Sequence, residues 1–159
     1  SGTFSRTSFL IETFQISDLA IESGFYMHPL TEKETIALCL NDLLGIYEKK
    51  GGNYYDDFVV KCANLGMQYF PKSYLTGRMA DAVKYRLGKN MESIGLTSYE
   101  QINAYPELID YYNYMLDLYD NLTNWGYKPV TSEWYDEQVR NMYQQKKENE
   151  QKQQQTNNK

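Results

Sequence analysis

The stretch LLGIYEKKGGNYYDDFVV, residues 43–60, holds the end of one helical pattern and the start of another. Apolar residues recur at helical spacing up to Lys49-Lys50, and the pattern stops at Gly51-Gly52. It resumes after two tyrosines with Asp56-Asp57, acidic residues that suit the first turn of a helix. Because glycine readily adopts the left-handed backbone that ends a helix, the stretch predicts a helical hairpin with a short turn.

The first helix of this hairpin begins at the capping box Thr31-Glu-Lys-Glu34, in which hydroxyl and carboxylate satisfy each other's backbone amides. Small residues in the second helix, Ala63 and Gly66, predict close approach of a neighbouring helix, and Pro71 ends it. Each helix has apolar residues recurring along one face. These are Ile36, Leu40, Leu43 and Tyr47 in the first helix, and Phe58, Cys62, Leu65 and Tyr69 in the second.

Further helices are predicted downstream. The third spans 74–93, although Gly88 offers an earlier end, and Gly95 stops it. A second capping box, Thr97 to Glu100, predicts a short helix up to about residue 105, and Pro106 suits the first turn of the next one. The inner faces are predicted to be Leu75, Met79, Val83 and Leu87 in the third helix, and Leu108, Tyr112, Met115, Tyr119 and Leu122 in the helix after Pro106.

The two ends of the chain are less regular. Residues 1–30 mix alternating and helical spacing, so their structure stays ambiguous. Ser132 is predicted to cap a last helix, and residues 144–159 form a Gln/Lys/Asn tail without apolar side chains, expected to be frayed or disordered. The prediction is therefore an all-α fold, with antiparallel helical hairpins stacked as a short solenoid or bundle over residues 31–143.

The composition is that of an acidic, tyrosine-rich domain. The 159 residues suit one domain, and a hydrophobic content of 42% is enough for a core. Tyrosine occurs 16 times against 6 Phe and 2 Trp. Tyrosine buries a ring and keeps a polar tip, so it serves both half-buried helix seams and contact surfaces.

The charge and hydropathy exclude several classes of partner. A net charge of −5 disfavours nucleic acid, which requires a concentrated basic face. No apolar run approaches the roughly 18 residues that a membrane span needs. No signal peptide is visible, and a soluble protein of either the cytoplasm or the periplasm fits the sequence. The oligomeric state stays open.

No set of residues in the sequence specifies a reaction, a metal or a cofactor. The only histidine is His28, and the only cysteines are Cys39 and Cys62, too few for a four-ligand zinc site. Both cysteines lie in apolar helical patterns and are expected to be buried, although a disulfide between the two helices is an alternative. His28 is expected to be a solvated or capping loop residue, and we therefore expect no enzyme and no cofactor.

Helix pairs joined by glycine-containing turns resemble tetratricopeptide repeats. The residues that carry the resemblance are Leu44-Gly45, Ala63, Gly66 and Pro71, and Pro71 to Pro106 is close to the length of one repeat. Two extra residues in the turn, and the missing leucine and glycine spacing after Tyr74, depart from that pattern.

Residues 25–88 resemble something narrower, the helical region that follows the transglutaminase-like domain in a family of bacterial proteins. The resemblance rests on Pro-Leu-Thr-x-x-Glu, Leu-Asn-x-Leu-x-x-x-Tyr and Tyr-Phe-Pro. The enzymatic half of that family requires a cysteine followed by a histidine, whereas here the only histidine, His28, precedes both cysteines. The resemblance thus implies a non-catalytic helical part.

The leading functional hypothesis is a tetratricopeptide-like module that binds a protein or peptide without catalysis. One alternative is an accessory region of a larger transglutaminase-like or peptidase-like protein, and another is a small ligand-binding helical bundle. First-helix faces of stacked hairpins line a concave side, and the helix after Pro106 offers additional aromatic side chains. The candidate binding residues are Asp42, Lys49, Arg78, Tyr85, Tyr111 and Tyr114.

Overall fold

The structure, a computed structural model, describes residue 11, residues 14–128 and residues 136, 137, 139–141, 143, 144 and 147. These residues form helices and turns and contain no strand, which confirms the all-α prediction for this part of the chain. The helices are α2 (Asp18–Glu22), α3 (Glu32–Lys49), α4 (Asp57–Tyr69), α5 (Tyr74–Ser93), the 3-10 helix η1 (Tyr99–Ala104) and α6 (Pro106–Asn124).

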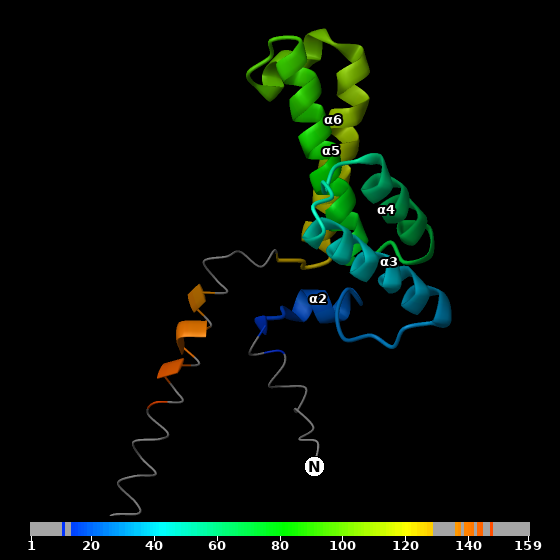
Figure 1. Cartoon of the computed structure of the whole chain (residues 1–159), viewed down its shortest axis with the longest axis vertical. Coiled ribbons are helices and arrows are strands. Elements are labelled where there is room, and N and C mark those ends of the chain that lie inside the picture. The colour runs from blue at the N-terminus through cyan, green and yellow to red at the C-terminus, as the bar shows by residue number, and fades with distance from the viewer. Residues whose placement is uncertain are drawn as a thin grey trace, which may run out of the picture. The chain divides into compact units, whose positions relative to one another are not determined.

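Consecutive helices pack on one another in antiparallel fashion. α3 lies on α4, α4 on α5, and α5 on α6, with η1 against α6 (Figure 1). The described residues up to Tyr127 belong to one compact unit, and a separate unit begins at Lys128. The predicted helix after Ser132 and the polar tail lie largely outside the described residues.

The predicted hairpin is α3 and α4. Thr31 and Glu34 form the expected capping box, with the Glu34 carboxylate 2.7 Å from the Thr31 amide nitrogen. Gly51 has a φ of +94° and provides the predicted left-handed stop. Asp56 lies one position before the predicted first turn, because it is the N-cap of α4, where its carboxylate accepts from the Val59 amide at 3.1 Å.

The predicted apolar faces of α3 and α4 are not the faces buried most deeply. Ala37 and Leu44 of α3 and Val59 of α4 are the residues packed into the core, one position along from the predicted stripes. Those stripes border the seam between the two helices, so Leu40 and Tyr47 are half-buried. Five members are exposed, as neither helix covers them: Ile36, Leu43, Phe58, Leu65 and Tyr69.

The third helix agrees with its prediction. α5 runs without interruption through Gly88 to Ser93, so the earlier end offered by that glycine is not used. All four predicted inner residues are buried. Met79, Val83 and Leu87 share a core cluster with α6, whereas Leu75 packs in a second cluster with α3 and α4. On α6, Leu108, Met115 and Leu122 are buried as predicted. Gly66 of α4 is buried, and a Cβ on it would overlap the Leu75 side chain, which is the close helix approach that small residues predicted.

The short helix before Pro106 is a 3-10 helix, and its capping box lies one residue later than predicted. Ser98 is the N-cap and Gln101 is its partner, whose side-chain oxygen accepts from the Ser98 amide at 3.1 Å. Thr97 instead donates its own amide to the same oxygen at 2.8 Å. The capping box shifts by one residue because glutamine serves this motif as well as glutamate. The tighter 3-10 turn also favours the later start.

The ambiguous segment before Thr31 packs onto the C-terminal end of α6. Ser17 caps α2, and the Ser23 hydroxyl donates to the Trp125 carbonyl at 2.9 Å. Gly126 has a φ of +76° and lies so close to α2 that a Cβ would meet the Ala20 backbone at 2.7 Å. An aromatic cluster fills the junction: Phe25, Tyr26, Tyr74, Trp125 and Tyr127.

Candidate functional site

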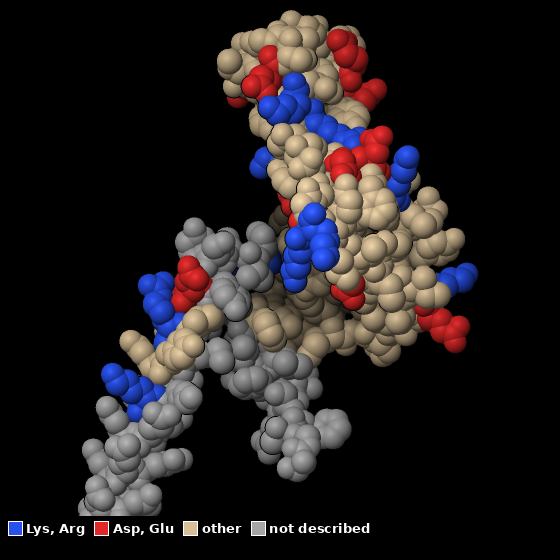
Figure 2. Space-filling model, in the orientation of Figure 1, with Lys and Arg blue, Asp and Glu red and all other residues tan. Residues whose placement is uncertain are grey.

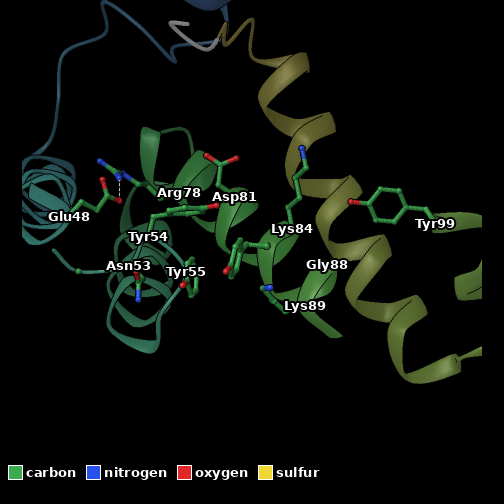
Figure 3. Close-up of a pocket in the computed structure, with 12 residues that line it drawn as sticks. Glu48, Asn53, Tyr54, Tyr55, Arg78, Asp81, Lys84, Gly88, Lys89 and Tyr99 are labelled. Atoms are coloured by element: carbon green, nitrogen blue, oxygen red, sulfur yellow. Dashed lines mark hydrogen bonds and ion pairs between the residues drawn. The ribbon is translucent and has the colours of Figure 1, made fainter. Parts of the chain in front are cut away.

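An open groove of about 790 Å³ lies between the α3–α4 turn and the exposed side of α5 (Figure 3). The turn contributes Asn53, Tyr54 and Tyr55, which follow the glycine pair directly. Glu48 comes from the last turn of α3 and Tyr99 from η1, at opposite ends of the lining. The side chains contributed by α5 are Arg78, Asp81, Lys84, Tyr85 and Lys89.

Three tyrosines form the aromatic wall of this groove. The rings of Tyr55 and Tyr85 stack in parallel, with centroids 3.7 Å apart and an interplanar angle of 16°. Tyr54 meets Tyr85 edge-on at 5.7 Å and is 44% exposed, so it presents ring surface to solvent. The adjacent Tyr85 hydroxyl, through a hydrogen bond between the two side chains, is the main cause that raises the pKa of Tyr55 above its usual value.

Arg86 holds this wall in place. Its Nε donates to the Tyr55 carbonyl oxygen at 2.7 Å, and its Nη2 lies 2.8 Å from a carboxylate oxygen of Asp57. The guanidinium therefore joins α5 to both ends of the short segment between Tyr55 and α4. This arrangement fixes the stacked rings before anything binds.

Charges of both signs line the groove. Arg78 forms an ion pair with Glu48 and also donates to the Asn41 side chain at 3.4 Å. Asp81 accepts from the Tyr119 hydroxyl at 2.9 Å, which helps to raise the pKa of that tyrosine together with burial, the larger cause. Figure 2 likewise shows acidic and basic side chains interspersed over the visible face.

A second hollow, of about 720 Å³, adjoins the first across the tyrosine stack. Tyr55, Tyr85 and Lys89 line both hollows. Arg86 and Tyr111 line only the second. The stacked pair is thus a ridge with a recess on each side.

The structure brings together only part of the predicted binding set. Arg78 and Tyr85 line the groove, and Tyr85 and Tyr111 line the second hollow. Asp42 and Lys49 are exposed on α3, and Tyr114 is exposed on α6, but none of these three lines either hollow.

Sequence reasoning missed Tyr54, Tyr55 and Asp81. The signal available for the first two was their position directly after the glycine pair, where a turn residue can project beside the next helix. Asp81 carried no such signal, because an acidic residue on an amphipathic helix usually belongs to the solvated face.

His28, Cys39 and Cys62, the residues with the most reactive side chains, line neither hollow. His28 packs edge-on against Phe70, with ring centroids 5.4 Å apart, and its Nε2 lies 3.6 Å from Glu34. Both cysteines are free, so no disulfide joins α3 and α4. Cys62 is half-buried, whereas Cys39 is exposed, which makes the prediction of burial wrong for Cys39 because it lies on the uncovered side of α3.

Two absences apply to the described residues only. Within them, no group of three or more His, Cys, Asp or Glu side chains is arranged to hold a metal ion. In the same part of the chain, no helix has the length and apolar character needed to cross a bilayer.

Comparisons of the chain with family models, with curated proteins and with solved structures found no match. The candidate site therefore rests on the geometry of the groove alone.

Proposed function

We propose that this chain is a non-catalytic module that binds a peptide or an extended protein segment in the groove between the α3–α4 turn and α5. The observation that supports this most directly is the pre-arranged tyrosine wall, Tyr54 against the stacked pair of Tyr55 and Tyr85. Tyrosine offers large contact area with only two side-chain torsions to fix, so it binds at a low cost in conformational entropy.

The groove has the features that an extended peptide requires. Its volume lies within the range of about 300–1,000 Å³ typical of ligand sites, and it is open along its length. Apolar side chains of the peptide would pack on the tyrosine rings, while Asp81 and Lys84 would pair with groups of opposite charge. The Arg78–Glu48 pair joins α5 to the last turn of α3 among the residues that line the groove.

A tetratricopeptide-like architecture is part of this proposal. It is supported by the α3–α4 hairpin and by Gly66, which brings α4 close to the Leu75 and Leu40 side chains. A role as the helical part of a larger transglutaminase-like protein is the related proposal, and the reading frame upstream of residue 1 tests it. A domain there with a cysteine followed by a histidine is the expected result.

Selection of random peptides displayed on phage against the whole chain tests the binding proposal. We expect an enriched sequence whose synthetic peptide binds in isothermal titration, and we expect Tyr85→Ala to weaken that binding at least about tenfold. The reason is that this ring contacts both other tyrosines of the wall.

Tyr114→Ala is the matched control, because Tyr114 is an exposed tyrosine outside both hollows. Thermal melting followed by circular dichroism establishes that both variants are folded. If Tyr114→Ala weakens binding and Tyr85→Ala does not, the binding surface is the face of α6, and the groove proposal is wrong.

A further inference from the structure

α3 carries a second apolar face that none of the described residues covers. Its core face is formed by Ala37 and Leu44. On the other side Ile36 is 68% exposed, Leu43 is 43% exposed and Ile46 is 58% exposed. A helix that is apolar on two faces buries the second one against a partner.

The uncovered face continues onto α4. The Tyr47 ring of α3 lies 4.7 Å from the Phe58 ring, measured between centroids, so the two helices form one surface here. Phe58, Leu65 and Tyr69 are each more than a third exposed along α4. The surface is therefore two helices wide and larger than a scatter of single apolar residues, which would need no explanation.

The spacing on α3 points to a helix as the occupant. Ile36, Cys39, Leu43 and Ile46 recur at intervals of three, four and three residues, and Cys39 is also exposed. This is the repeat that packs one α-helix against another along a coiled-coil seam.

The apolar residues of this stripe are placed symmetrically about residue 41. Counted outward from that residue, Ile36 and Ile46 are equidistant, and so are Cys39 and Leu43. Four residues before Ile36 lies Glu32, in the first turn of the helix, and four residues after Ile46 lies Lys50, at its C-terminal end. These two charged residues are also equidistant from residue 41, and both are exposed. A surface with this symmetry is complementary to itself when one copy runs antiparallel to the other.

We propose that the outer face of α3 is a self-association surface on which a second copy of this chain docks its own α3, antiparallel, about a two-fold axis near residue 41. Ile36 packs on Ile46 of the second copy, and Cys39 packs on Leu43 of the second copy. Glu32 pairs with Lys50 of the second copy at each end, so both apolar and charged contacts occur twice. This surface lies outside the two hollows, and the proposal is independent of peptide binding.

One residue opposes this association. Asp42 is exposed beside Leu43, one residue from the axis, so the two copies bring their Asp42 carboxylates near each other. Like charges in a seam cost stability, and Asp42→Asn removes the repulsion without changing size. The variant is expected to tighten the dimer several-fold.

Sedimentation velocity from about 1 µM to about 1 mM protein tests the self-association, since this range reaches even weak dimers. We expect a reversible monomer–dimer equilibrium in the wild type. Leu43→Lys should raise the dissociation constant about a hundredfold, because the lost apolar contact is repeated by symmetry. Leu116→Lys is the control, a similarly exposed leucine on α6, and should leave the constant unchanged. A wild type that remains monomeric throughout overturns the proposal.

Charge reversal tests the antiparallel register. Glu32→Lys alone brings two lysines together at each end, and Lys50→Glu alone brings two glutamates together, so each should weaken the dimer about tenfold. Mixing the two variants restores opposite charges at both ends of a heterodimer and should bring its dissociation constant back to within a few-fold of the wild type.

A mixture of Glu107→Lys and Lys61→Glu carries the same charge changes on residues of α6 and α4, outside the proposed α3 seam, and controls for general attraction between oppositely charged proteins. If the Glu32→Lys and Lys50→Glu mixture gains no more affinity than this control mixture, the antiparallel α3 pairing is wrong.

Discussion

At the scale of single residues, the contact between Tyr47 and Asp56 connects the two helices of the hairpin on which the groove is built. The Tyr47 hydroxyl donates to the Asp56 carboxylate, and this hydrogen bond is the main cause that holds the pKa of Asp56 below its usual value. The same carboxylate caps α4 through the Val59 amide. A lowered pKa in the folded state means that the ionised form stabilises the fold.

The sign of the pH dependence follows from that shift. The contribution of Asp56 is present above the unfolded pKa of about 3.9 and is lost as the pH falls through the lower folded value. Tyr47→Phe keeps the ring against Phe58 but removes the donor. We expect a small loss in the free energy of unfolding near neutral pH, small because the pair is solvated, and a smaller loss in acid.

Urea unfolding of both proteins at neutral pH and in acid measures this difference. Asp56→Asn provides the control, because asparagine also caps a helix but does not titrate over this range. In that background the effect of Tyr47→Phe should not change with pH. An effect that grows in acid would contradict the assignment.

At the scale of the helices, the prediction of the buried face held for a helix with one apolar face and failed for a helix with two. α5 has one apolar stripe and is buried along it, so periodicity predicted both its bounds and its inner face. α3 has apolar residues on two faces, and periodicity cannot choose between them, because both have helical spacing. The choice depends on where α4 and α5 lie, and that is set by tertiary contacts such as the close approach at Gly66.

A pair of glycine variants tests that close approach. Gly66→Ala places a Cβ against the side chain of Leu75, which is fully buried, so overpacking of about 1–3 kcal/mol should outweigh the gain of about 1 kcal/mol in helix propensity. Gly88→Ala meets nothing within 4 Å and should stabilise by up to about 1 kcal/mol. Urea unfolding measures both, and equal stabilisation by the two variants would show that α4 and α5 are not packed as described.

At the scale of the whole compact unit, the candidate site combines segments that are distant in sequence. Tyr54 and Tyr55 come from a turn, Tyr85 from the middle of α5 and Tyr99 from η1. The analogy with stacked hairpins predicted Arg78 and Tyr85, since these lie on one exposed side of a helix. It could not predict the turn tyrosines, because their direction depends on the Arg86 contact to the Tyr55 carbonyl, which no periodic pattern encodes.

The measurement that tests the central claim most directly is an amide chemical-shift map of the isotope-labelled chain, recorded with and without a peptide selected against it. The account predicts that the largest shift changes fall at residues 53–55 and along 78–89, on both sides of the tyrosine wall. Changes concentrated around Tyr114 on α6, or along the outer face of α3, would contradict it.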